Sequence, residues 1–149
     1  VNYYIHQVNL IRHFLGEDYK VTYADPSGVL LAGQSTSGVP CVLEMTPYET
    51  TVDWQESILI CFEHGWIKVE LPAPLAINTP GAVTVFRDPG AGATPETIIP
   101  QLPCIHAMRQ QAKNFLAAVR GECKPMCDVT EAFKDLETAR QYLKQWKGV

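Results

Sequence analysis

The chain has 149 residues, of which 46% are hydrophobic, and its 12 Lys and Arg against 16 Asp and Glu give a formal charge of -4. A chain of this length forms one domain that buries about 70% of its unfolded surface, so folding requires neither a disulfide nor a metal. The composition excludes a disordered protein, and no apolar run reaches the roughly 20 residues that span a bilayer. No basic cluster could follow a phosphate backbone, so we expect neither a membrane nor a nucleic acid as partner.

The cysteines indicate a reducing compartment, and we expect a cytoplasmic protein. They are odd in number and scattered, and they lie in apolar strand-like runs or near a helix end, unlike the cysteines of a secreted framework: Cys41, Cys61, Cys104, Cys123 and Cys127. Cys123 and Cys127 have no second pair or suitably spaced His after them, so we expect no metal site. The chain begins without Met and shows no targeting signal, which suggests a piece of a longer protein.

Residues 1–16 are predicted to form a helix that ends at Gly16. At about 100° per residue, four amide and imidazole side chains fall on one stripe opposite an apolar arc: Asn2, His6, Asn9 and His13. Such a stripe, without the Lys and Glu of an ordinary solvated face, favours a polar cleft for an uncharged, hydroxyl-rich ligand. The alternative is a partly exposed helix face with no ligand.

The middle of the chain reads as five to seven strands joined by turns. The predicted strands are 20–24, 29–36, 39–48, 54–62, 66–71, 83–87 and 96–99. The strand 54–62 is apolar on both faces in its middle, so both faces are expected to be covered. Gly65 is expected to need a positive φ where the chain turns back. Gly90-Ala91-Gly92 is rejected as a dinucleotide motif because Pro95 stands where the third glycine belongs.

The last third is predicted to be helical. Apolar residues recur at helical spacing in a first helix that ends at Gly121, and His106 is expected to contribute to its start. Asp128 and Glu131 form a capping box for a second helix. Its expected buried stripe is Phe133, Leu136, Ala139, Leu143 and Trp146.

This order of elements predicts a two-layer α+β domain over residues 1–149, with a predominantly antiparallel open sheet and the helices packed on one face. The other face is then an apolar wall, which we expect to dimerise with a second copy. The alternative is that the Pro-rich segment from residue 72 onward covers it.

The opening helix resembles the one that begins the C-terminal domain of the Gfo/Idh/MocA oxidoreductases, the family of glucose-fructose oxidoreductase and inositol dehydrogenase. The family pattern Asp-x-Gly-x-His-x-x-Asp, followed by an apolar stretch ending in Gly, is similar to residues 2–9 and 14–16 here. Further landmarks stand in similar order along nearly the whole chain: Trp54-Gln55-Glu56, Gly65, Phe115, Pro125 and Asp128.

The resemblance implies the substrate-binding and dimerisation domain of an NAD(P)-dependent oxidoreductase that transfers hydride to or from a sugar, inositol or related polyol. NAD or NADP would be held by an N-terminal Rossmann domain that is missing here, so the chain alone should bind no cofactor and catalyse no turnover. His6 would be the catalytic proton relay, with Asn2 beside it. The substrate-binding residues would be Asn2, His6, Asn9, Arg12 and Tyr3.

Two departures from the family pattern leave a second interpretation open. Asn2 stands in place of the usual Asp and Asn9 where a second Asp often lies, and an amide cannot take a proton. Tyr4 replaces a small Gly and would crowd the approach to nicotinamide. The alternative function is therefore a non-catalytic oligomerisation or ligand-sensing module. Two further residues have ordinary alternatives: Arg12 as a surface arginine, and Trp54 as a packing residue and not a platform for a sugar ring.

Overall fold

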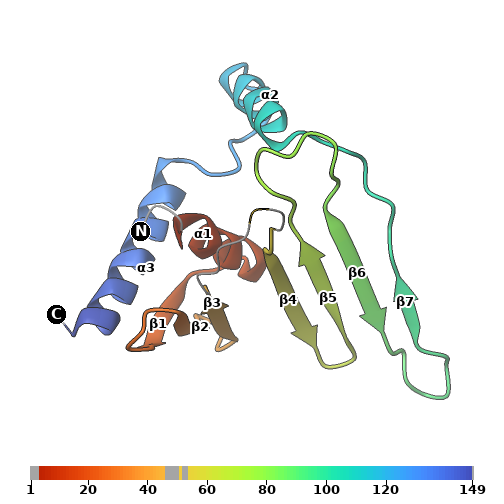
Figure 1. The fold of residues 1–149 in the computed structure, drawn as a ribbon, viewed down its shortest axis with the longest axis horizontal. Coiled ribbons are helices and arrows are strands. Elements are labelled where there is room, and N and C mark those ends of the chain that lie inside the picture. The colour runs from red at the N-terminus through yellow and green to blue at the C-terminus, as the bar shows by residue number, and fades with distance from the viewer. Residues whose placement is uncertain (1–3, 46–50, 52–53, 149) are drawn as a thin grey trace. The chain divides into compact units, whose positions relative to one another are not determined.

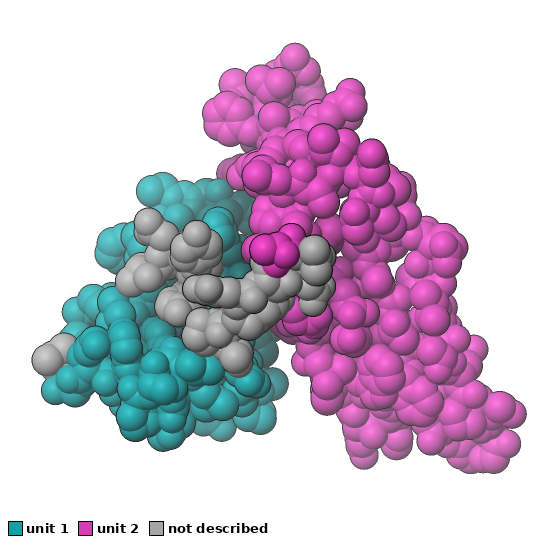
Figure 2. Space-filling model, in the orientation of Figure 1, with its two compact units in different colours: residues 1–49, 126–149 teal, residues 50–125 magenta. Residues whose placement is uncertain are grey.

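The computed structural model describes residues 4–45, 51 and 54–148, which form two compact units. Unit 1 comprises residues 1–49 and 126–149, and unit 2 comprises residues 50–125 (Figure 2). Each unit contains its own antiparallel sheet together with one or more helices, so the predicted α+β class with antiparallel pairing is confirmed. The strands form two sheets, however, and not the single sheet expected from the sequence. No helix in the described ranges has both the length and the apolar character that crossing a bilayer requires.

Unit 1 packs two helices with a three-stranded sheet of order β1-β2-β3 (Figure 1). Its elements are α1 (Tyr4–Leu15), β1 (Tyr19–Ala24), β2 (Leu30–Ser35), β3 (Pro40–Glu44) and α3 (Val129–Lys147). Helix α1 ends at Gly16, whose φ of 68° is the left-handed conformation predicted for it. The predicted end of the third strand, at residues 46–48, lies outside the described residues.

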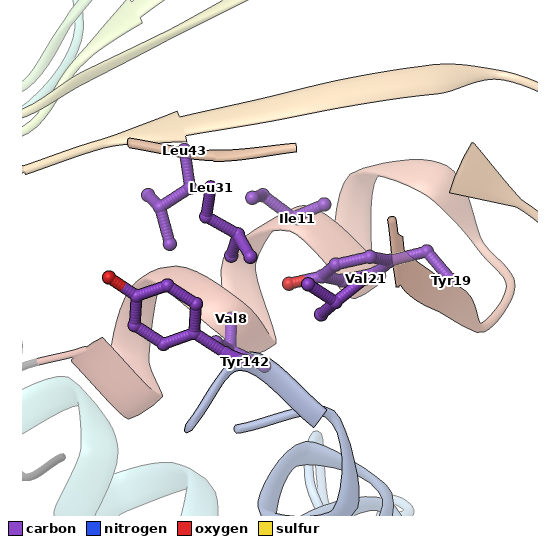
Figure 3. Packing of buried hydrophobic residues seen from close by; sticks show 7 residues of the cluster. All are labelled: Val8, Ile11, Tyr19, Val21, Leu31, Leu43 and Tyr142. Carbon is purple, nitrogen blue, oxygen red and sulfur yellow. The ribbon is translucent and has the colours of Figure 1, made fainter. Parts of the chain in front are cut away.

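The core of unit 1 is a cluster of apolar side chains contributed by both helices and all three strands. Figure 3 shows these side chains directed toward one another: Val8, Ile11, Tyr19, Val21, Leu31, Leu43 and Tyr142. Leu31 and Val8 are the most deeply buried, at 1% and 2% exposure. Burying an aliphatic side chain of this size contributes about 1.5–3 kcal/mol, so the cluster fixes both helices on the sheet.

Helix α3 closes unit 1 through the turn between β1 and β2. The Tyr142 hydroxyl donates to the carbonyl oxygen of Gly28, and Trp146 Nε1 donates to that of Pro26 at 3.0 Å. A Cβ on Gly28 would lie 2.8 Å from the Trp146 ring, and Gly28 has a φ of 77°. The turn therefore requires glycine both for its conformation and for the close approach of α3.

The predicted buried stripe of α3 is wrong at Phe133 and Leu136, whereas Trp146 packs against the core as predicted. The residues that the helix buries are Asp135, Thr138, Ala139 and Tyr142. Phe133 and Leu136 are 70% and 55% exposed instead, and only Ala139 of the predicted stripe is buried. The prediction selected the apolar residues, but the core face of this helix is built around Tyr142 and a charged side chain, Asp135, whose partner is on α1.

Unit 2 is a four-stranded sheet of order β4-β5-β6-β7 with one helix. Its elements are β4 (Ser57–Phe62), β5 (Gly65–Glu70), β6 (Ala82–Arg87), β7 (Glu96–Ile98) and α2 (Ala107–Val119). Helix α2 begins at His106, whose Nδ1 accepts a hydrogen bond from the Arg109 amide at 3.1 Å, as expected for a helix start. None of the described residues in 50–125 is buried. This unit therefore has no interior of its own, and the expected cover over both faces of β4 is not supplied within it.

The register of unit 2 places the Ile and Val residues of its strands on one face of the sheet. Ile60, Ile67, Val85 and Ile98 are cross-strand neighbours through all four strands. We call this the aliphatic face, and its members are Ile58, Ile60, Ile67, Val69, Val83, Val85 and Ile98. The opposite face is mixed, because it carries Lys68 and Thr84 beside the stacked rings of Trp66 and Phe86.

Glycine is required at position 65 for a different reason from the one predicted. It is not among the glycines with positive φ, so the expected left-handed conformation is wrong. Gly65 instead begins β5 directly opposite Arg87, and a Cβ there would overlap the carbonyl oxygen of Phe86. The residue must be glycine because β6 approaches too closely for a side chain.

Candidate functional site

His6, the predicted proton relay, lies on the outside of α1. Its side chain is exposed, as is that of His13 two turns later. No hydrogen bond or ion pair joins the His6 imidazole to another residue that the structure describes. The predictions for Asn2 and Tyr3 fall outside the described residues, and the structure leaves them as predictions.

Asn9 does not continue the outward stripe, because it turns toward α3. Its Nδ2 donates to Asp135 Oδ2 at 2.7 Å and lies 3.9 Å from the sulfur of Cys127. The sequence places Asn9 with His6 and His13 on one face, yet the helix packs so that Asn9 is half-buried. Its amide group is thus engaged by the protein.

Arg12 is buried, with 6% exposure, so the alternative of an ordinary surface arginine is wrong. Its Nε and Nη2 both donate to Asp18 Oδ1, at 3.1 and 2.9 Å. Its Nη1 donates to Asp135 Oδ1 at 2.5 Å and to the Glu131 carbonyl oxygen at 3.1 Å, and Nη2 also reaches Glu131 Oε2 at 2.5 Å. These five bonds use every N–H of a guanidinium, so none is left to bind a substrate anion.

The ion cluster around Arg12 stabilises the charged forms of its members. Burial alone lowers the pKa of Arg12, but the hydrogen bonds to Asp135, Glu131 and Asp18 outweigh it and the net shift of the pKa is upward. Hydrogen bonds from Lys134 and Arg12 hold the pKa of Glu131 below its usual range. The same contact with Glu131 raises the pKa of Lys134. Arg12, Glu131 and Lys134 are therefore charged at neutral pH.

Sequence reasoning missed this cluster. It singled out Glu131 as the second half of a capping box, and Asp128 does act as the N-cap, accepting from the Thr130 and Glu131 amides at 2.9 and 3.0 Å. The Glu131 carboxylate, however, bonds Arg12 and Lys134. The sequence pattern that could have indicated it is a pair of acidic residues, 131 and 135, four positions apart on one face of a helix. A buried arginine requires such carboxylate partners.

A polar cleft of about 470 Å³ opens beside the cluster, at the C-terminal end of α1. Its walls include Asn9, Arg12, His13, Glu17, Glu131 and Lys134. Several of these side chains are already paired, since Glu17 accepts from the hydroxyl and amide of Ser37 and Lys134 bonds Glu131. His6 is not among the residues that line this cleft, so the cleft does not coincide with the predicted catalytic position.

Two features of the described residues bear on the binding of a metal or a dinucleotide. They contain no group of three or more His, Cys, Asp and Glu side chains placed to hold a metal ion, and all five cysteines are free thiols. Both sheets are antiparallel throughout, whereas a dinucleotide-binding fold uses parallel strands joined by helices. Gly90, Ala91 and Gly92 all have positive φ and form a turn before β7.

Comparison with solved structures identifies similar folds in two oxidoreductases. No known family's sequence profile and no curated protein sequence matches the chain. The structure matches an aldose-aldose oxidoreductase from Caulobacter crescentus, crystallised with glycerol, over 97% of this chain and 44% of that one, with a TM-score of 0.63 and 14% identity. It also matches a mutant 3-ketoreductase from Actinomadura kijaniata, in complex with TDP-benzene and NADP, over 97% of this chain and 45% of that one, with a TM-score of 0.61 and 14% identity. The chain thus spans less than half the length of either protein, and the fold expected from the resemblance to Gfo/Idh/MocA oxidoreductases is confirmed.

Proposed function

We propose that residues 1–149 are the substrate-binding and dimerisation part of an NAD(P)-dependent oxidoreductase that acts on a sugar, inositol or related polyol. The observation that carries the proposal is the exposed His6 on the first helix of a fold shared with two oxidoreductases over 97% of the chain. In this proposal the nucleotide is held by a part of the polypeptide outside residues 1–149. The free thiols suit a reducing compartment such as the cytoplasm.

In this proposal His6 acts on the hydroxyl group of the substrate. A nicotinamide held by the longer polypeptide would supply the hydride acceptor. A neutral His6 imidazole would accept the hydroxyl proton as the carbon–oxygen single bond becomes a carbonyl, and would return a proton in the reverse direction. Asn2 and Tyr3 remain predicted neighbours of the substrate. Asn9 and Arg12, which donate to Asp135, act by holding α1 in position.

We further propose that a second copy of the chain covers the aliphatic face of unit 2. The face carries seven β-branched aliphatic residues across four strands, and the ion pair of Arg87 and Glu96 lies on the same side at one end of the sheet. Ile98 is 45% exposed and the other six are half-buried. An apolar sheet surface of this kind is typical of an interface and can pack on its own copy around a two-fold axis.

The decisive experiment uses the protein that contains residues 1–149, with NAD(P) and a panel of sugars and inositols. His6→Ala should lower turnover by about 100-fold or more if His6 relays the proton. His13→Ala is the matched control, because His13 is exposed on the same helix but continues away from its start. Equal activity of wild type and His6→Ala would contradict the proposed role.

A non-catalytic ligand-sensing or oligomerisation module is the second candidate. It is favoured by Asn2, which cannot take a proton, and by the bulky Tyr4 in place of glycine. In that case the wild-type protein would bind a polyol, measured by calorimetry, without oxidising it in the presence of NAD(P). Turnover by the wild type would exclude this candidate.

A further inference from the structure

The polar cleft at the C-terminal end of α1 lies entirely within unit 1. Its volume of about 470 Å³ falls in the range of roughly 300–1,000 Å³ that is typical of small-molecule sites. Such sites are usually lined by apolar side chains. Among the described residues that line this cleft, only Met126 has an apolar side chain, and the rest are polar, charged or glycine. The cleft therefore suits a polar ligand.

Two charged side chains in the cleft keep hydrogen-bonding capacity after their contacts within the protein are made. Asp18 Oδ1 accepts two hydrogen bonds from Arg12, while Oδ2 accepts none from the described residues and lies 3.8 Å from Lys134 Nζ. Within the same part of the chain, Lys134 donates one hydrogen bond, to Glu131, so two of the three N–H groups of its ammonium remain. The Asp18 and Lys134 side chains are 53% and 43% exposed, so a ligand can reach both.

A hydroxyl group fits the space between these two side chains. At 3.8 Å, Lys134 Nζ and Asp18 Oδ2 are too far apart for a direct hydrogen bond, which needs about 2.7–3.2 Å. A hydroxyl oxygen beside both groups can accept from the ammonium and donate its proton to the carboxylate. Asn9 also lines the cleft, and because its Nδ2 is bonded to Asp135, its carbonyl oxygen is left as an acceptor for another hydroxyl.

The charges that line the cleft favour an uncharged ligand over an ion. Arg12 and Lys134 supply two positive charges, and three carboxylates stand beside them: Glu17, Asp18 and Glu131. An anion would meet these carboxylates and the negative end of the α1 dipole. A cation would compete with Arg12 and Lys134, which already pair with Asp18 and Glu131. A neutral ligand avoids both penalties.

We propose that this cleft binds a neutral polyhydroxy molecule, of the class of sugars and cyclic polyols, and that Asp18 and Lys134 share one of its hydroxyl groups. The site is separate from the proposed catalytic position, because Gly16 in the cleft lies ten residues after His6, about 15 Å along the axis of α1. Binding there requires neither a nicotinamide nor proton transfer, so this inference does not rest on the proposed function. The ligand would stabilise unit 1, since it joins the segment after α1 to α3.

The test is NMR of the full protein with ¹³C-labelled methionine methyl groups, titrated with myo-inositol and, separately, with D-glucose, in the absence of NAD(P). Met126 lines the cleft and is 74% exposed, whereas Met45 packs against the core of the same unit. Met126→Leu and Met45→Leu assign the two signals. We expect the Met126 signal to shift progressively with the concentration of at least one polyol, and the Met45 signal to stay in place.

Two variants locate the binding groups. Lys134→Leu removes a charge-assisted hydrogen bond and should weaken binding by about tenfold or more. Lys144→Leu, exposed on the same helix and not part of the cleft, should bind as the wild type does. Asp18→Asn keeps an oxygen that can accept from Arg12 but puts an NH₂ group where the ligand hydroxyl would donate, so it should weaken binding to a similar extent. Circular dichroism verifies that each variant is folded.

The proposal is overturned if the Met126 signal does not move with either polyol, or if folded Lys134→Leu binds as tightly as the wild type. A shift with inorganic phosphate or methylammonium, but with neither polyol, would also overturn it. His6→Ala separates this inference from the proposed function, because it should leave the shift of Met126 unchanged. If Met126 shifts and the wild type turns over no polyol with NAD(P), only the proposed function fails. If the wild type turns over a polyol and Met126 does not respond, only this inference fails.

Discussion

Arg12 and Asp135 form a buried ion pair across 123 residues of sequence, with Nη1 and Oδ1 at 2.5 Å and side-chain exposures of 5% and 4%. The other carboxylate oxygen of Asp135 accepts a hydrogen bond from Asn9, so one carboxylate on α3 binds two side chains of α1. The pair therefore determines how the helix that carries His6 sits on the rest of unit 1.

Removing the Asp135 carboxylate should strongly lower the free energy of unfolding. Asp135→Ala leaves the buried guanidinium of Arg12 short of a partner, and breaking such a pair costs about 3–5 kcal/mol of unfolding free energy. Glu137→Ala breaks an exposed pair with Arg140 on the same helix and should cost at most about 1 kcal/mol. Urea unfolding followed by circular dichroism measures both. Similar losses in the two variants would show that burial of the Arg12 pair is unimportant.

Stability should fall at acidic pH, and Glu131 should account for part of the fall. Hydrogen bonds from Lys134 and Arg12 lower its pKa in the folded protein. A lowered pKa contributes stability that is present above the unfolded value of about 4.3 and is lost as the pH falls through the folded value. Glu131→Gln should therefore flatten the dependence of Tm on pH between about pH 5 and 3, measured by calorimetry. Glu63→Gln, at the exposed β4-β5 turn, serves as control, and an unchanged slope in Glu131→Gln would refute the assignment.

Gly65→Ala should destabilise the protein by about 1–3 kcal/mol, because the new methyl group would overlap the Phe86 carbonyl and push β6 away. Gly81→Ala is the comparison, since its Cβ would lie 3.2 Å from the Glu70 carbonyl oxygen, a contact that a small shift relieves. Thermal unfolding ranks the two variants. A Gly81→Ala variant less stable than Gly65→Ala would contradict the close approach of β5 and β6.

The aliphatic face should control the oligomeric state. Ile67→Asp places a charge in the centre of that face and should halve the mass measured by light scattering. Thr84→Asp makes the same change on the mixed face and should leave the dimer intact. A monomeric wild-type protein, or an Ile67→Asp variant that remains dimeric, would rule out this interface.

Residues 1–149 should unfold in one transition, as predicted for a single domain. Unit 2 buries none of its described residues, so it has no interior from which to derive independent stability. We therefore expect its sheet to melt together with unit 1, or with the second copy that covers it. Calorimetry of the full protein, combined with hydrogen exchange of the β5 and α3 amides, measures this. Loss of protection in β5 at a much lower temperature than in α3 would contradict the prediction.

The sequence was informative where the signal is local. Alternating apolar residues located every strand to within a few residues, and Gly16, Gly121 and Asp128 marked helix ends because their conformations or caps depend on neighbouring residues. The fold class followed from the order of these elements.

What the sequence concealed depends on contacts between distant segments. Two carboxylate partners of Arg12, those of Glu131 and Asp135, lie 119 and 123 residues away, and the sequence near position 12 does not indicate that its guanidinium is buried. The buried face of α3 was predicted incorrectly for the same reason. Asp135 is buried on that face because Arg12 of α1 pairs with it. The division into two sheets likewise depends on strand pairing, which periodicity does not specify.

The bonds from Tyr142 and Trp146 to the turn at Pro26 and Gly28 have a consequence for synthesis of the protein. Unit 1 is assembled from the two ends of the chain, with all of unit 2 inserted between them. During synthesis, the apolar surface of α1 and of β1 to β3 therefore stays uncovered until α3 has left the ribosome. Contacts of such large sequence separation slow folding, so the nascent chain should expose a binding surface for chaperones until α3 has been made.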